Sequence, residues 1–406
     1  MSAGLAPQTE APFWPIARAC PNCEGDGLFG FARVPDIPVH NSLVLATAEE
    51  ARNFPRGDLE LAFCRRCAFI TNTAFDLGRI RYDPTYEDQQ SFSPTFNAFA
   101  QRIAGDLVER YDIRGKDVVE VGCGKGDFLA LVCEFGANRG VGIDPTALPG
   151  RLGGQPGAER VTLVAEHYGE RHARYPADLV MCRHTLEHVP DPLAFLRTVR
   201  RAIGAREGTV VFLEVPDTLR VLRETAYWDM YYEHCSYFTP GSFARLARAA
   251  GFTVLRNRLD FDEQYLLLEA RPGASRDEAA EPRDDVAQTE SLVLAYAASL
   301  ARQLERWRAH FAMLHDAGKR VAVWGSGSKC VAFLTTLGPG VPIERVVDIN
   351  PHRHGKFIPG AGLEIAAPSS LVAYRPDEVV VMNPIYLDEI RAMLRALDVH
   401  AEVVAV

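Results

Sequence analysis

The stretch Val118-Val-Glu-Val-Gly-Cys-Gly-Lys-Gly126-Asp-Phe-Leu decides the fold of this chain. An apolar run ends in the acid Glu120 and a glycine-rich turn, and an apolar segment suited to a helix follows. Glycines let a backbone approach a ligand closely, and the first N–H groups of a helix have no partner within the helix. The stretch therefore predicts a strand, a ligand-binding loop and a helix.

Strands and helices alternate on both sides of this loop. The apolar runs predict strands at Asp117–Val121, Gly140–Ile143, Val161–Val164, Asp178–Cys182 and Thr209–Glu214. Helices such as Asp127–Glu134 and Pro192–Ile203 separate them, which predicts a parallel sheet covered on both faces. Two further runs, Phe252–Phe261 and Tyr265–Arg271, lie so close together that they predict a closing antiparallel hairpin.

The glycine loop resembles the signature of S-adenosylmethionine methyltransferases more than the dinucleotide fingerprint. Its glycines follow a G-x-G-x-G pattern and are Gly122, Gly124 and Gly126. That cofactor carries an ammonium and a sulfonium but no phosphate, so Glu120 beside the loop is electrostatically suited to it. Asp144 ends the next strand, where an acid accepts hydrogen bonds from a ribose, and Glu166 ends the third strand, near the expected adenine.

Two cysteine pairs near the start of the chain predict a structural metal site. Their spacing is C-x-x-C, forty residues and C-x-x-C, and the residues are Cys20, Cys23, Cys64 and Cys67. Four thiolates suit a tetrahedral Zn²⁺ ion and leave no open position for catalysis. The alternative is four free thiols or a disulfide pair.

Histidines next to two of the strands are candidates for acid–base chemistry. His184 follows the fourth strand, and the aromatic-rich stretch Tyr227–Phe238 after the fifth strand contains Tyr231, Glu233 and His234. Loops after the strands of such a sheet lie at its carboxyl edge, where ligands bind. An imidazole there can act as a general base near neutral pH. The alternative for each histidine is a hydrogen-bonding role inside the structure.

Composition and charge narrow the class of protein. The 406 residues include 47% hydrophobic and 24% charged ones, as in globular proteins of two or three domains. The net charge of −9 argues against nucleic acid as a partner. The sequence has neither an apolar run long enough to span a membrane nor a signal peptide. Of the nine cysteines, four form the two C-x-x-C pairs and five are scattered in apolar surroundings, which is typical of a reducing compartment, so we expect a cytoplasmic protein.

The chain divides into four parts. We expect a zinc-binding segment over 13–80, a methyltransferase domain over 81–272, a linker over 273–290, and a long helix with a second α/β domain over 291–406. The long helix carries an apolar stripe that we expect to pack on its own domain rather than in a dimer. The second α/β domain begins with another glycine loop, Gly325–Lys329. The predicted fold class is α/β, Rossmann-like in both domains.

The order of these parts resembles the S-adenosylmethionine-dependent sugar C-methyltransferases. The resemblance covers nearly the whole chain and rests on the cysteine pairs, Glu120–Gly126 and Tyr231-Tyr-Glu-His234. It implies C-methylation of a nucleotide-linked 4-keto-6-deoxysugar in natural-product or polysaccharide biosynthesis. His234 would remove the proton next to the ketone, Glu233 and Tyr231 would assist, and His184 would be a further active-site histidine. The enzyme would be a monomer or a homodimer.

Some assignments stay open at this stage. The family also uses an aromatic residue ahead of the methyltransferase domain, for which Tyr86 and Phe92 are both candidates. Lys329 of the second loop suits either a phosphate of the substrate or a structural role, and Asp348 stands where a ribose-binding acid would. An O-, N- or C-methyltransferase of another small natural product is the alternative function. An NAD-dependent oxidoreductase is disfavoured, because the second loop lacks a third glycine.

Overall fold

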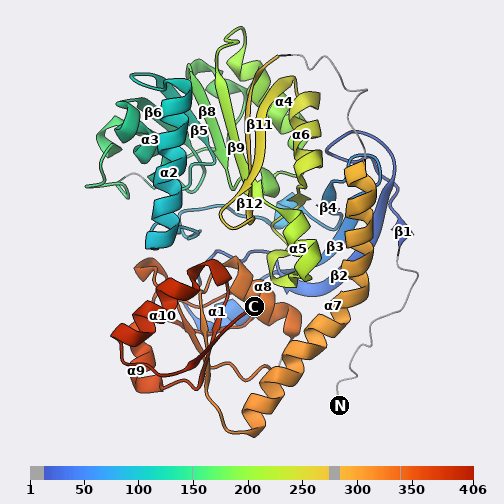
Figure 1. Ribbon diagram of the computed structural model, residues 1–406, viewed down its shortest axis with the longest axis vertical. Helices are drawn as coiled ribbons and strands as arrows, with labels where there is room; N and C mark the ends of the chain where they lie inside the picture. Colours follow the sequence, from blue (N-terminus) through green and yellow to red (C-terminus); the bar gives the residue numbers. More distant parts are fainter. Residues whose placement is uncertain (1–12, 149, 274–283, 339) are drawn as a thin grey trace.

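The central sheet of this protein carries the first glycine loop (Figure 1). The computed structural model describes residues 13–148, 150–273, 284–338 and 340–406. The strands of the central sheet, in spatial order, are β11 (Phe252–Asp260), β12 (Tyr265–Pro272), β9 (Val210–Pro216), β8 (Leu179–Arg183), β5 (Asp117–Val121), β6 (Arg139–Ile143) and β7 (Val161–Val164). Strands β9 to β7 of this order are parallel, whereas β11 and β12 form an antiparallel hairpin beside β9. The predicted parallel sheet and its closing hairpin are confirmed.

Helices cover both faces of the central sheet, as its alternating side chains require. Helices α2 (Pro94–Tyr111) and α3 (Asp127–Gly136) pack on one face, and α4 (Pro192–Ile203) and α6 (Pro240–Ala249) pack on the other. Neighbouring residues of β5 accordingly pack into two different hydrophobic cores, one on each face of the sheet. Val118 packs in the core that contains Leu129 of α3, whereas Val119 packs in the core that contains Leu196 of α4.

The starts of three of these helices follow one local rule. A side chain caps the first turn, and a proline with its fixed φ stands at the first helical position. The pairs are Ser93 and Pro94 in α2, Asp191 and Pro192 in α4, and Thr239 and Pro240 in α6. These capping residues and prolines fix the residue at which each of the three helices begins.

The strand order reverses at β5. The chain passes from β5 to β6 and β7 on one side and then returns to β8 on the other side. The connections after β5 and β8 consequently diverge, and a crevice opens between them at the carboxyl edge of the sheet. This is where a ligand of the first glycine loop would bind.

The N-terminal sheet is antiparallel and borrows its last strand from the central domain. In spatial order its strands are β1 (Trp14–Pro15), β2 (Leu28–Pro38), β3 (Arg56–Cys64), β4 (Ile70–Asn72) and β10 (Ser236–Tyr237). The short helix α1 (Ala48–Arg52) lies between β2 and β3 in the chain. Because β10 pairs with β4, the aromatic-rich stretch after the fifth parallel strand is anchored on the N-terminal segment.

The C-terminal domain is a second parallel sheet. Its strands, in spatial order, are β15 (Ile365–Ala366), β14 (Arg345–Val347), β13 (Val321–Trp324), β16 (Glu378–Val381) and β17 (Glu402–Ala405). The helices of this domain are α8 (Ser328–Leu337), α9 (Leu371–Tyr374) and α10 (Leu387–Ala396). The second glycine loop connects β13 to α8, so the predicted strand–loop–helix unit is present here as well.

The long helix α7 (Asp284–Asp316) packs on its own chain. Its apolar stripe shares one core with β2, with β13 and α8, and with the helix α5 (Thr218–Glu224). The helix begins inside the stretch 273–290 that the sequence assigns to a linker, of which 274–283 lies outside the described residues. Asp285 pairs with Arg245 at 2.6 Å, so charged residues that look like a linker form the first turns of a docked helix. None of the helices in the described ranges has the length and apolar character needed to cross a bilayer.

Candidate active site

A cavity of about 640 Å³ joins the two glycine loops. It lies at the crevice of the central sheet, and the C-terminal domain forms its opposite wall. Its lining includes Gly122 and Gly124 from the first loop and Ser328 and Lys329 from the second. A volume of this size suits a small-molecule ligand.

The three glycines of the first loop all adopt positive φ, at 71°, 53° and 93° for Gly122, Gly124 and Gly126. Gly122 and Gly124 differ in the atoms that a Cβ at each position would contact. A Cβ on Gly122 would stand 1.9 Å from Thr185 Oγ1, whereas a Cβ on Gly124 would meet nothing within 4 Å. The loop is thus closely packed below, at Gly122, and open towards the cavity at Gly124.

Two of the predicted acids meet at this loop. Asp144 accepts a hydrogen bond from the backbone N–H of Gly124 at 2.9 Å and another from Thr146 at 2.6 Å. Glu120 is buried, and its Oε2 has no hydrogen-bond partner among the described residues. Burial, opposed by the charge of Arg183, raises the pKa of Glu120 to about 8. A buried carboxyl without a partner, next to an open backbone loop, fits a cationic ligand such as S-adenosylmethionine.

The third predicted acid lies elsewhere. Glu166 is exposed and pairs with Arg171 at 2.7 Å and with His172 at 3.3 Å, and it is absent from the described residues that line the cavity. Asp88, which the sequence did not single out, lines the cavity instead. The Asp88 side chain is exposed to the cavity, and desolvation by the surrounding protein, together with the charge of Asp144, raises the pKa of Asp88 to about 7. In the sequence, Asp88 stands in a polar run next to Tyr86. That run has no helical or strand periodicity from which the position of Asp88 could have been predicted.

His234 lines the cavity as a neutral imidazole. Its ring lies against Tyr231, with ring centroids 4.1 Å apart, and against His188, with centroids 4.6 Å apart. Burial, with the positive charges of neighbouring groups, lowers the pKa of His234 well below its ordinary value. The ring therefore stays unprotonated at neutral pH and can accept a proton.

Two further histidines of the cavity, His184 and His188, have different neighbours. His184 Nε2 lies 2.8 Å from Glu214, and its Nδ1 lies 3.6 Å from Glu187. Burial disfavours its charge, but these two carboxylates outweigh burial and raise the pKa of His184 to about 9. His188, in contrast, shares a hydrogen bond of 2.8 Å between its Nδ1 and the hydroxyl of Tyr82. His184 is thus a positive charge in the cavity wall, and His188 is the direct neighbour of His234.

Glu233 turns away from His234 and into the protein. Its Oε2 lies 2.9 Å from His40 Nδ1 and accepts the hydroxyl of Tyr86 at 3.2 Å, while its Oε1 accepts the backbone N–H of Asn41 at 2.9 Å. Burial raises the pKa of Glu233, whereas the hydrogen bonds from His40 and Asn41 lower it. The net effect is a pKa below the ordinary value. Tyr86 and Phe92 both line the cavity, but Tyr86 is the one that contacts Glu233.

The second glycine loop repeats the geometry of the first. Asp348 accepts hydrogen bonds from the backbone N–H of Ser326 at 2.7 Å and from that of Asn350 at 2.9 Å, as Asp144 does from its own loop. Lys329 forms a half-buried ion pair with Asp229. Both Asp348 and Lys329 line the cavity. The two loops thus share one arrangement, in which the acid after the next strand accepts a backbone N–H of the loop.

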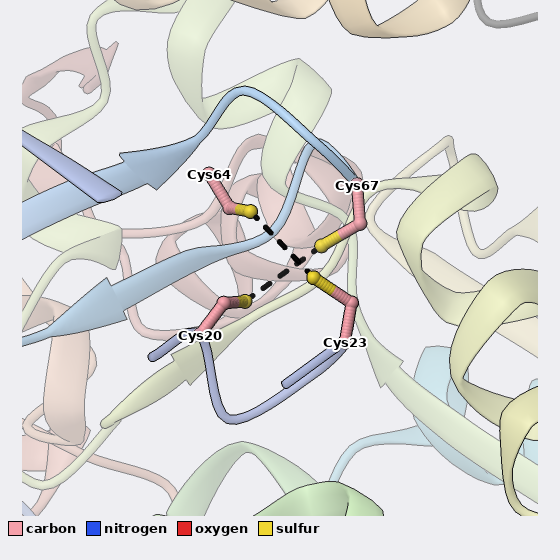
Figure 2. A group of neighbouring side chains, drawn as sticks. All are labelled: Cys20, Cys23, Cys64 and Cys67. Atoms are coloured by element: carbon pink, nitrogen blue, oxygen red, sulfur yellow. Dashed lines mark hydrogen bonds between the residues drawn. The ribbon is translucent and has the colours of Figure 1, made fainter. Parts of the chain in front are cut away.

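The four predicted metal ligands come together, as Figure 2 shows. The Sγ–Sγ distances are 3.8 Å for Cys20 and Cys67 and 3.8 Å for Cys23 and Cys64. A tetrahedral ion bound by four sulfurs at about 2.3 Å requires sulfur–sulfur distances of about 3.8 Å. The cysteines are not joined as disulfides, and their donor set and spacing fit a metal ion.

Two family profiles match this chain. Residues 96–257 match the family described as "Methyltransferase domain", and residues 272–404 match the family described as "C-methyltransferase C-terminal domain". The chain is also 27% identical over 393 residues to "C-methyltransferase NovU" from Streptomyces niveus, in a match that covers 91% of this chain and 90% of that protein.

Shorter matches involve other methyltransferases. A "Ubiquinone biosynthesis O-methyltransferase" from Cupriavidus pinatubonensis is 31% identical over 169 residues, which cover 36% of this chain and 64% of that protein. The solved structure of Burkholderia thailandensis 1,6-didemethyltoxoflavin-N1-methyltransferase with bound S-adenosylhomocysteine matches 43% of this chain and 78% of its own, at 25% identity and a TM-score of 0.34.

Gly122→Ala and Gly124→Ala form a matched pair of variants, since both glycines have positive φ. We expect Gly122→Ala to lower the melting temperature strongly, because its methyl group collides with Thr185. Gly124→Ala adds a methyl group to the open cavity, so it should cost only the ~1–2 kcal/mol of a left-handed alanine while weakening S-adenosylmethionine binding. Scanning calorimetry and titration calorimetry measure the two effects. Unchanged affinity in Gly124→Ala would contradict the placement of the cofactor.

The raised pKa of Glu120 predicts proton release when a cation binds. A carboxyl with a pKa of about 8 is mostly protonated at neutral pH, and a bound cation favours its ionised form. We expect nearly one proton to be released per S-adenosylmethionine at about pH 7, and the affinity to rise with pH until the free carboxyl is itself ionised, at about pH 8. Titration calorimetry in buffers of different ionisation enthalpy counts the protons. The idea fails if Glu120→Gln releases as many protons as the native protein.

Proposed function

Because this chain is an S-adenosylmethionine-dependent methyltransferase with a C-methyltransferase C-terminal domain, we propose that it methylates the carbon next to a ketone. The acceptor we propose is a nucleotide-linked 4-keto-6-deoxysugar. The observation that carries the proposal is the cavity, onto which the first glycine loop, the neutral imidazole of His234 and the second glycine loop all open.

A carbon nucleophile explains why a base is needed. Bound at the first loop, S-adenosylmethionine supplies a methyl group that is already a strong electrophile, so an oxygen or nitrogen acceptor needs little help. A carbon next to a ketone first has to lose a proton. His234 is neutral at physiological pH and borders the cavity, so it is suited to remove that proton.

The groups around His234 fit the charges that this step creates. Removal of the proton leaves an enolate, and His184 contributes a positive charge to the same cavity wall. The ring of His188 packs edge-on against the ring of His234, and its Nδ1 shares a hydrogen bond with the Tyr82 hydroxyl. We therefore assign the base to His234, its neighbouring partner to His188, and stabilisation of the enolate to His184. Tyr231 packs on the base, and its hydroxyl stays protonated because burial raises its pKa.

The second glycine loop supports a nucleotide-linked acceptor. Ser328, Lys329 and Asp348 line the part of the cavity contributed by the C-terminal domain. The backbone N–H groups at the start of α8 and the ammonium of Lys329 suit phosphate oxygens. Asp348 stands where it would meet a ribose. The ketosugar would then extend from this loop towards His234.

The first test is methyl transfer to a panel of nucleotide-linked 4-keto-6-deoxysugars, followed by mass spectrometry. We expect a gain of one methyl group with the native protein and a kcat lower by about 10²–10⁴-fold in His234→Ala. The native kcat should stay flat as the pH falls through about 6.5, where an ordinary histidine would already be protonated.

The control is His172→Ala, which truncates an equally buried histidine outside the lining of the cavity. It should keep the native kcat. If His234→Ala keeps full activity, the acceptor atom needs no base, which favours O- or N-methylation of another small molecule. If no ketosugar gains a methyl group although the cofactor binds, the ketosugar proposal is wrong.

We also propose that the four-cysteine site holds a structural Zn²⁺ ion. Three of the four cysteines are buried and Cys23 is half-buried, the sulfur spacing suits tetrahedral coordination, and the two knuckles have the same local geometry. In each, the backbone N–H four residues after the first cysteine donates to that cysteine's carbonyl, at 2.8 Å for Glu24 and 2.9 Å for Ala68. Asn22 donates to Cys67 Sγ at 3.5 Å, which favours a thiolate there.

Metal analysis of the purified protein should find one zinc per chain. Cys64→Ser should lose the metal and unfold at a lower temperature, because an incomplete site leaves buried thiols without their ion. Cys330→Ser is the matched control, since Cys330 is equally buried but lies in α8. Native protein without zinc, or a Cys64→Ser variant with full zinc content, would refute the assignment.

A further inference from the structure

The loop after β2 joins all three parts of the protein at the edge of the cavity. The Asn41 backbone N–H donates to Glu233 in the central domain, and its side chain donates to the carbonyl of Ser328 in the second glycine loop at 3.1 Å. The Ser42 hydroxyl lies 2.9 Å from that of Ser328, and its carbonyl accepts the backbone N–H of Glu87. The metal-binding segment therefore reaches the active site directly.

His40, in the same loop, has a fixed protonation pattern. Its Nε2 accepts the backbone N–H of Arg81 at 2.8 Å, so its proton stands on Nδ1. That Nδ1–H points at Glu233 Oε2, 2.9 Å away. Only 1% of the His40 side chain is exposed, and none of the Glu233 side chain is. The pair is therefore a buried charge-assisted hydrogen bond of defined direction.

The carboxylate of Glu233 connects His40 to Tyr86, because the same oxygen accepts from both side chains. Neither His40 nor Glu233 is among the described residues that line the cavity, whereas Tyr86 is. The Tyr86 hydroxyl donates to the same Oε2 that accepts from His40, and the His40 ring packs edge-on against the Tyr86 ring. The hydroxyl proton of Tyr86 is thus directed at Glu233, so its oxygen can only accept hydrogen bonds from other groups.

We propose that His40 is a positioning residue for methyl transfer, which acts through Glu233 to fix the Tyr86 hydroxyl at the edge of the cavity. The inference rests on the proposed function, because Tyr86 is taken to contact the acceptor substrate. If His40 has this role, the metal-binding segment contributes to catalysis as well as to the stability of the fold. The segment supplies one of the side chains on which the active-site geometry depends.

The test compares four single variants and one double variant. His40→Ala removes the donor to Glu233, whereas His40→Asn keeps an N–H close to the position of Nδ1. Tyr86→Phe removes the hydroxyl that is to be positioned. Asn72→Ala is the matched control, because Asn72 is equally buried, lies in the same N-terminal sheet and donates to the carbonyl of Tyr232, one residue before Glu233.

We expect His40→Ala to lower kcat for the ketosugar about 10- to 100-fold with an unchanged dissociation constant for S-adenosylmethionine, because a misplaced contact costs rate more than cofactor affinity. His40→Asn should recover most of the rate, and Asn72→Ala should keep it despite a lower melting temperature. In the Tyr86→Phe background, His40→Ala should cost little more, since both changes remove the same contact. Full additivity, or an equal kcat loss in Asn72→Ala, would overturn the inference.

A second readout needs no acceptor. The ring carbon that carries the hydroxyl of Tyr86, labelled with ¹³C and assigned with Tyr86→Phe, should shift in His40→Ala and stay in place in Asn72→Ala. An unmoved signal in His40→Ala would refute the link between His40 and Tyr86. If that signal shifts but the native protein methylates no ketosugar, the proposed substrate is wrong and the positioning contact stands.

Discussion

A fully buried carboxylate has to be surrounded by donors, and Glu233 obtains its donors from distant parts of the chain. His40 and Asn41 are 193 and 192 residues away in sequence, and Tyr86 is 147 residues away. An unpaired charge at this depth would cost several kcal/mol, so the three segments have to meet for the site to be stable. The N-terminal sheet, the segment ahead of α2 and the aromatic-rich stretch before α6 are therefore held in one arrangement around the cavity.

Local patterns predicted most of the fold. The Glu120–Gly126 loop, the alternation of strands and helices and the C-x-x-C pairs each depend on residues that are close in sequence. Strands β5 and β7 and helix α4 begin and end at the predicted residues. The cysteines came together because two short knuckles, each with its own turn, need only one strand pairing between β2 and β3 to meet.

What the sequence missed depends on contacts between distant segments. His40 and Tyr82 carry no motif, and their roles follow only from the positions of Glu233 and His188. Glu166 stands at the predicted place in the chain, but its side chain pairs with Arg171 outside the cavity. The sequence predicted His184 as a further active-site histidine but not its charge, which follows from the carboxylates of Glu187 and Glu214 beside it. The first turns of α7 have the composition of a linker but are helical, and Asp285 there pairs with Arg245 of α6.

The borrowed strand β10 also has a consequence for the order of events during synthesis. The contact between Thr71 and Cys235, beside β10, spans 164 residues. At roughly 5–20 residues per second, the ribosome needs about 10–30 s to make that stretch. For this time the edge of β4 has no neighbour, and unpaired sheet edges are where nascent chains associate with one another. The short length of β4, Ile70–Asn72, limits that exposure to three residues. A longer β4 would give the unfinished protein more opportunity to aggregate before its active site exists.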